Sequence, residues 1–234
     1  IKKAGKLPII FADKDSWTIH QGWDAIDMSS RGSQDDFFQN VLNGDAFLYE
    51  DSIALDSTRK FLEIRKYGQK QTVNTGYDEA VKKFANGEAY MFFQGNWAYP
   101  MIKKINPDID LLFMPFPAYH ENQAKVVVKI DATLGVSASC KHLEAVEQFL
   151  DYVFSKNVSE YYADKAGAYS CIKSVDVEDS YAKAFTDSIR SGEFFLEEFA
   201  YETEKSDAIN ALFQNFISSP QRDTEKSFLK ELND

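Results

Sequence analysis

The segment that most constrains the fold is residues 77–99, where a helix signal, a stop and a strand signal follow one another directly. The helix has acidic side chains in its first turn, which favours the positive end of the helix dipole. It ends at Gly87, because glycine adopts the left-handed conformation without a Cβ clash. Residues 88–94 have the length and composition of a strand, and Gly95 allows a tight turn into a helix that begins at Trp97. This order predicts an α/β unit with an indole at the end of a strand.

An indole directly after a strand has two interpretations. Trp97 either plugs the hydrophobic core or lies at the strand-to-helix corner, where ligands collect in α/β sheets. Asn96 beside it carries an amide that can hydrogen-bond a ligand hydroxyl. Trp17 follows an earlier predicted strand, residues 7–14, and has the same two interpretations. His20 lies three residues further on and either shares that face or is a surface histidine.

Two further residues are candidates for ligand contact. Asp131 interrupts an otherwise apolar pair of strand segments, and its carboxylate either accepts hydrogen bonds from adjacent ligand hydroxyls or bonds its own backbone in a turn. Lys129 is a weaker companion to it. Tyr169 lies in the loop with the sequence AGAYS and either lines a cleft or is an ordinary loop tyrosine.

The rest of the chain alternates strand and helix signals, which is typical of the α/β class. Strands are predicted at 7–14, 88–94, 110–114, 124–130 and 133–138. Helices are predicted at 16–26, 34–42, 51–67, 78–85, 142–155, 157–166, 178–191, 203–217 and 223–232. In the strand at 88–94 alternation predicts Ala89, Met91 and Phe93 on one side and Tyr90, Phe92 and Gln94 on the other. The helix at 142–155 is the clearest, because its apolar residues share one face.

The net charge of −11 and the pI of about 4.8 argue against a nucleic-acid partner and against direct adhesion to anionic lipid. No catalytic motif and no metal-ligand spacing stand out, so we expect no metal and no cofactor. Cys140 and Cys171 are either a disulfide or two ordinary thiols. No apolar run has transmembrane length. The start at Ile1, without a signal peptide, is interpreted as a processed or truncated end.

The segment 84–97 also carries a motif, F-x-x-G-x-A-x-M followed by G-x-W. It resembles the signature of the extracellular solute-binding proteins of ABC importers, the carbohydrate-binding, maltose-binding-protein-like family. The resemblance continues through residues 7–17 and 127–155. It continues again at 166–172, although that loop lacks the family's proline.

The resemblance implies a type II periplasmic-binding-protein-like lobe of α/β class, with most of the N-terminal lobe absent. By the family's pattern, residues 1–116 are the first part of the C-terminal lobe and 170–234 are its last part. Residues 117–169 then belong with the missing N-terminal lobe. Either a companion fragment completes the fold there, or the segment repacks.

The resemblance also implies a function: a sugar, and more specifically an oligosaccharide, is held between two lobes by aromatic stacking and hydroxyl hydrogen bonds. Its ligand contacts would be Trp97, Asn96, Trp17, Asp131, Tyr169 and His20. The implied partners are the sugar, the importer's membrane permease and the missing lobe, with a lipid anchor outside this chain as the link to the membrane. The implied location is extracellular, anchored at the cell surface, or periplasmic.

Two alternatives stay open from the sequence. One is a glycoside-active enzyme with a carboxylate pair in an aromatic cleft, because 37 acidic residues leave many possible pairs. The other is a binding protein for a non-sugar solute such as a peptide or polyamine. Turnover of chromogenic glycosides favours the enzyme, whereas ligand-induced stabilisation without turnover favours the receptor.

Overall fold

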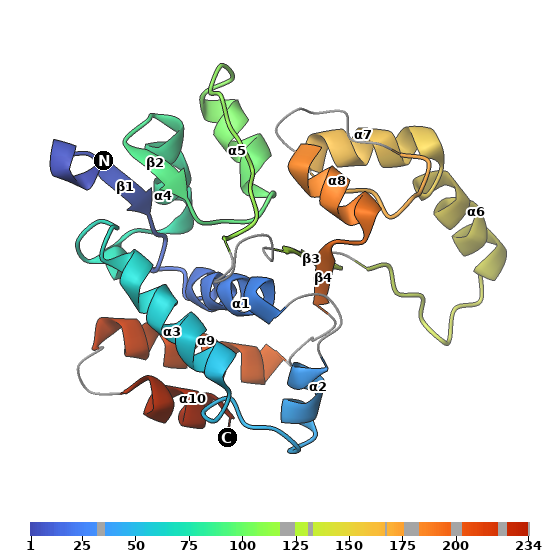
Figure 1. The fold of residues 1–234 in the computed structure, drawn as a ribbon. Helices are drawn as coiled ribbons and strands as arrows, with labels where there is room; N and C mark the ends of the chain where they lie inside the picture. The colour runs from blue at the N-terminus through green and yellow to red at the C-terminus, as the bar shows by residue number, and fades with distance from the viewer. Residues whose placement is uncertain are drawn as a thin grey trace.

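The computed structural model describes residues 1–31, 36–117, 125–130, 133–166, 168–175, 183–197, 203–219 and 224–233 (Figure 1). Its strands are β1 (Leu7–Ile10), β2 (Ala89–Phe92), β3 (Val126–Lys129) and β4 (Phe194–Glu197). Its helices are α1 (Trp17–Arg31), α2 (Phe37–Leu42), α3 (Ser52–Arg65), α4 (Tyr77–Ala85), α5 (Ala98–Ile105), α6 (Leu143–Val153), α7 (Lys156–Ala166), α8 (Lys183–Ser191), α9 (Thr203–Ser218) and α10 (Glu225–Asn233). Two short 3-10 helices, η1 (Lys2–Ala4) and η2 (Thr72–Asn74), complete the described elements. The structure is of mixed α/β class and rich in helix.

The strands form two parallel pairs, β1 with β2 and β3 with β4. The Cα partners include Leu7 with Ala89 and Ile10 with Phe92 in the first pair, and Val126 with Phe194 and Lys129 with Glu197 in the second. In each pair the strands are far apart in the sequence, as parallel pairing requires.

Two of the predicted strands are wrong. Residues 110–114 and 133–138 have the composition of strands, but neither is a strand in the structure. A strand needs a neighbour that satisfies its backbone hydrogen bonds, and these segments have no ladder partner among the described residues. Conversely, β4 was not predicted, because four residues after a helix give only a weak local signal.

The main hydrophobic core lies between α1, α3, α9 and α10. Phe213 of α9 is fully buried, and its ring centroid is 5.7 Å from that of Trp23 in α1. The Phe228 ring of α10 lies 4.9 Å from Phe213. The buried Trp23 indole donates its Nε1–H to the Thr58 hydroxyl of α3 at 2.9 Å, which satisfies its polar atom. Because α1 is anchored in this aromatic core, the position of Trp17, the first residue of α1, is defined by the core.

The predicted helix, stop and strand between 77 and 92 are confirmed. α4 buries Val81 and Ala85, and Gly87 has a φ of 75°, which ends the helix. The predicted faces of β2 are partly wrong, because Ala89 is 4% exposed whereas Met91 is 46% exposed. The described sheet has only two strands there, so Met91 has no third strand beside it and is left about half exposed.

The helix predicted at 142–155 is confirmed as α6, but its apolar face is open. None of its residues is buried, and Leu143 and Phe149 are 57% and 54% exposed. Figure 1 shows α6, α7 and α8 together on one side of the molecule, away from α3, α9 and α10. The surface that the sequence pattern marks for burial is only partly covered by the described residues, among which α7 contacts α6.

Cys140 and Cys171 are free thiols, which decides between the two alternatives for this pair. Within the described ranges, none of the helices has both the length and the apolar character needed to traverse a bilayer.

Candidate functional site

The Trp97 side chain is half-buried at the corner between β2 and α5. The turn is closed by a hydrogen bond from the Ala98 N–H to the Gly95 carbonyl at 3.1 Å. The six-membered ring of Trp97 lies directly against Gly95, because a Cβ at position 95 would be only 2.2 Å from two of its atoms. Glycine is therefore required here by the close approach of the indole, and the turn holds the ring in one place.

A second indole meets Trp97 at this corner. Trp17, the first residue of α1, is 39% exposed, and its ring centroid is 6.2 Å from that of Trp97 with the planes at 53°. The Tyr77 ring, from the start of α4, lies 5.4 Å from Trp17. The three rings, which we call the aromatic trio (Trp17, Tyr77 and Trp97), come from three segments that are distant in the sequence. The structure thus brings together two predicted site residues and adds a third.

Tyr77 was missed by the sequence reasoning; in the structure it is the first residue of α4, as Trp17 is the first residue of α1. Burial, and to a smaller extent the neighbouring Asp78, raise the pKa of its phenol to about 12, against the effect of a side-chain interaction with Trp97 that lowers it. The phenol is therefore protonated at physiological pH. Its hydroxyl oxygen is buried and has no partner of normal hydrogen-bond geometry among the described residues. A hydroxyl in this state can donate to a polar group that enters the corner.

Lys129 approaches the trio from β3. Its ammonium lies 5.7 Å from the centroid of the Trp97 ring, within the range of a cation–π contact. The side chain is exposed. The Lys129 ammonium, from the β3–β4 strand pair, is therefore a hydrogen-bond donor close to the Trp97 ring.

Of the other predicted site residues, one lies at the corner, one contacts the core and one is outside the described part of the chain. Asn96 belongs to the corner, where its carbonyl accepts from the Tyr99 N–H at 3.0 Å. His20 contacts the core, because its ring stacks on Phe213 at 5.0 Å and its Nε2 lies 3.2 Å from Asp24 Oδ2. Asp131 lies outside the described residues.

Tyr169 belongs to a second aromatic group. Its ring is parallel to that of Phe185 in α8 at 6.5 Å, and Phe185 meets Phe113 edge-on at 5.8 Å. Burial raises the pKa of Tyr169 to about 12, while a hydrogen bond with Thr186 lowers it. The ring of Tyr169 thus contacts Phe185 of α8.

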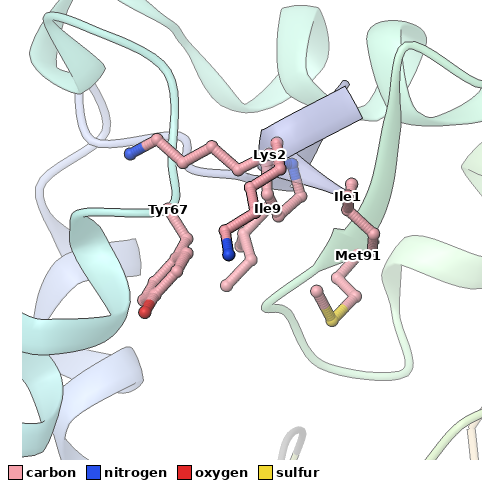
Figure 2. Close-up of a pocket in the computed structure, with 7 residues that line it drawn as sticks. Ile1, Lys2, Ile9, Tyr67 and Met91 are labelled. Carbon is pink, nitrogen blue, oxygen red and sulfur yellow. The ribbon is translucent and has the colours of Figure 1, made fainter. Parts of the chain in front are cut away.

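A shallow apolar groove lies elsewhere, against the outer side of β1 and β2. Figure 2 shows Ile1, Lys2, Ile9, Tyr67 and Met91 around it. It contains neither indole and few polar groups. No cluster of three or more histidine, cysteine or acidic side chains suited to a metal gathers within the described ranges. The aromatic trio is therefore the best-built candidate for ligand contact.

We expect Gly95→Ala to displace the Trp97 ring, because the new Cβ would meet it at 2.2 Å and the side chain is the part that can move. The tryptophan emission maximum and intensity of the chain should change, while its far-ultraviolet helical signal stays. Gly135→Ala is the matched control, since a Cβ there meets nothing within 4 Å. Identical emission spectra for both variants would contradict the close contact between Gly95 and Trp97.

The sequence matches the model of the family described as bacterial extracellular solute-binding protein over residues 1–159. The chain belongs to this family. A curated relative in sequence, the multiple sugar-binding protein of Streptococcus mutans, is 28% identical over 183 residues. That match covers 75% of the present chain and 43% of the relative.

Solved structures of solute-binding proteins share the fold. A sugar transporter protein from Bacillus licheniformis in complex with stachyose has a TM-score of 0.75 and 17% identity, covering 99% of this chain and 62% of that one. RafE in complex with raffinose, a protein also solved without ligand from Streptococcus pneumoniae, has a TM-score of 0.73 and 21% identity, covering 100% and 61%. The expected type II periplasmic-binding-protein fold is thereby confirmed. The chain spans less than two thirds of the length of each of these proteins.

Proposed function

We propose that this chain is part of the sugar receptor of an ABC importer, with an oligosaccharide held between two lobes. The observation that carries the proposal is the aromatic trio, in which two partly exposed indoles lie 6.2 Å apart at a strand-to-helix corner. The C–H faces of a sugar ring stack on such surfaces, while the hydroxyls at its rim need polar partners. Membership of a solute-binding family and relatives described as sugar-binding support the same conclusion.

Within the site we assign stacking to Trp97 and Trp17. Asn96 supplies hydrogen bonds beside them. Asp131 stays a proposed acceptor, and Tyr169 and His20 stay proposed contacts at the margin, to be tested by substitution. The Tyr77 hydroxyl and the Lys129 ammonium add donors at the trio itself.

The proposed lobe division follows the family pattern. Residues 1–116 and 170–234 are assigned to the C-terminal lobe, and 117–169 to the N-terminal one. We depart from this pattern for α8 alone, which contacts β3, and propose that it belongs with residues 117–169. The open face of α6 and the groove beside β1 and β2 are then the surfaces that the remaining length of the receptor covers (Figure 2). The permease and a lipid anchor complete the proposed partners, at the cell surface or in the periplasm.

The test of function is a thermal-shift screen of a chain extended to the length of its relatives, with sugars, peptides and polyamines as ligands. The receptor proposal predicts stabilisation by oligosaccharides that grows with ligand concentration, as mass action requires. Chromogenic glycosides are incubated in parallel. Turnover would favour the enzyme, and stabilisation by peptides or polyamines alone would favour a different solute.

We expect the 234-residue chain alone to bind oligosaccharide weakly or not at all. Stacking supplies about 0.5–1.5 kcal/mol per aromatic contact, and association itself costs several kcal/mol, so contacts from both lobes are needed. Calorimetry of the 234-residue chain against the extended chain, with the same sugar, checks this. Equal and tight binding by both would overturn the two-lobe proposal.

A further inference from the structure

The segment that carries Trp17 is tied to the start of α4 by a single carboxylate. Asp15 Oδ2 accepts a hydrogen bond from the backbone N–H of Tyr77 at 2.6 Å. The two residues are 62 positions apart, so this contact joins separate parts of the chain. The first N–H groups of a helix have no partner within it. Asp15 therefore supplies the cap that α4 lacks locally.

The residue at the usual cap position explains why the partner must come from elsewhere. Gly76 precedes α4 and has no side chain, so it offers no side-chain cap. A Cβ at Gly76 would lie 3.3 Å from Asp15 Oδ2, a tight contact. Glycine thus leaves room for a carboxylate that arrives from another segment.

The same segment is held at its other side. The Asp13 carboxylate is buried and pairs with the Arg65 guanidinium of α3. The Asp13 carbonyl accepts from Gln214 Nε2 of α9 at 2.9 Å. The Lys14 N–H donates to the Thr75 carbonyl at 3.1 Å. In the stretch between β1 and α1, Asp13 therefore binds α3 and α9. Lys14 and Asp15 bind the backbone at and just before the start of α4.

The hydrogen bond between Asp15 and Tyr77 connects the segment that carries Trp17 to a second member of the aromatic trio. Asp15 binds the backbone of Tyr77, and the Tyr77 ring is the one that packs on Trp17 at 5.4 Å. Trp17 in turn faces Trp97 at 6.2 Å. Loss of the Asp15 contact would remove the bond that joins the residues just before Trp17 directly to Tyr77, while Asp13 and Lys14 would still hold the segment.

We propose that Asp15 is a positioning residue of the ligand site: its hydrogen bond to Tyr77 sets the separation of the two indoles before any ligand arrives. A pair of rings fixed in advance binds with a smaller loss of side-chain entropy than two mobile ones. That the two indoles bind sugar rests on the proposed function. The effect of Asp15 on the separation of the two indoles in the ligand-free chain does not.

The test reads the indole pair directly, without ligand. Two indoles this close couple excitonically, and the part of the far-ultraviolet circular dichroism signal that both Trp17→Phe and Trp97→Phe remove reports their couplet. We expect Asp15→Ala to lose most of that couplet. Asp15→Asn should keep it, because its amide oxygen still accepts from the Tyr77 N–H. Thr224→Ala is the control, since the Thr224 hydroxyl accepts from the Ser227 N–H at 3.2 Å at the start of α10, remote in sequence from the trio.

Asp15→Glu keeps both charge and acceptor but changes their reach, so it tests the proposal even if Asp15→Ala does not fold. It should fold and show a reduced couplet. An unchanged couplet in Asp15→Ala or Asp15→Glu, with a loss of stability similar to that of Thr224→Ala, would overturn the proposal and leave Asp15 an ordinary helix cap. Failure of the extended chain to bind sugar, with the couplet behaving as expected, would instead count against the proposed function alone.

Discussion

Replacement of Arg31 by methionine should lower the free energy of unfolding at pH 7.5 by about 3–5 kcal/mol, the cost of leaving a buried charge without its partner. The Arg31 and Asp27 side chains are only 1% and 0% exposed, and their Nε and Oδ2 atoms are 2.5 Å apart. The same guanidinium reaches Asp51, which caps α3 through the Ala54 N–H at 2.7 Å. It also lies 3.8 Å from the centre of the Phe37 ring. One side chain thus joins α1, α2 and α3.

The pH dependence gives this prediction a second readout. Burial raises the pKa of Asp27 to about 6, while Arg31 lowers it. Because the folded pKa lies above the ordinary value of 3.8, the folded chain holds this proton more tightly than the unfolded chain. The stability from this group is present below about pH 4 and is lost as the pH rises through about 6, by about 3 kcal/mol in all. Without Arg31 the Asp27 pKa rises further, so the loss in Arg31→Met should be smaller at pH 5 than at pH 7.5.

Urea unfolding at the two pH values measures both effects. Arg59→Met is the matched control, because Arg59 is 58% exposed and pairs with an exposed Asp56, so its loss should cost less than about 1 kcal/mol. The double variant Asp27→Asn/Arg31→Met should recover part of the stability, since the fully buried Asp27 charge is removed together with its partner. Equal losses for Arg31→Met and Arg59→Met would contradict the assignment of a buried ion pair.

Simultaneous replacement of Trp17 and Trp97 by alanine should weaken oligosaccharide binding by the extended chain by about 10- to 100-fold. Each ring contributes about 0.5–1.5 kcal/mol of stacking, and 1.4 kcal/mol is a factor of ten. Both rings are partly exposed, so the core between α1 and α9 should remain folded. Calorimetric titration with the sugar that stabilises the wild-type chain most measures the change.

Tyr161→Ala is the control for the loss of an aromatic side chain. Tyr161 is 67% exposed and lies on α7, which is on the side of the molecule away from α3, α9 and α10 (Figure 1). Its removal should leave the affinity within about two-fold of the wild-type value, since surface substitutions usually have small effects. An unchanged affinity in the double tryptophan variant would move the binding site away from the trio.

Local signals predicted the corner correctly. The helix before Gly87, the strand after it and the turn into Trp97 depend on neighbouring residues, and the structure has all three. The end of η1 at Gly5, with a φ of 71°, follows for the same reason. Contacts between neighbouring residues determine these elements, so the sequence alone was enough to predict them.

Long-range contacts decided what the sequence left open. The pairing of Val126 with Phe194 joins segments that share no local signal, and it makes β4 a strand. The amphipathic pattern of α6 indicated a buried face, but burial requires a partner, and the described residues cover this face only in part. His20 packs on Phe213, which could not be inferred from its spacing to Trp17.

The candidate site shows the same division. The indoles and their turn were visible in the sequence, because Gly95 and Trp97 are adjacent in a motif. Tyr77 and Asp15 were not, since their importance arises only where α4 meets the segment after β1. Sequence spacing identifies the groups that can bind a ligand, whereas the tertiary contacts decide which of them meet.

Oxidation by N-bromosuccinimide, followed by peptide mass spectrometry, tests the role of the indole pair most directly. In the free extended chain, Trp17 and Trp97 should react readily, and Trp23 should react slowly because it is only 2% exposed. Saturation with the bound oligosaccharide should slow the oxidation of both Trp17 and Trp97 while leaving that of Trp23 unchanged. Oxidation of Trp97 at the same rate with and without saturating sugar would contradict the proposal that the ligand stacks on this ring.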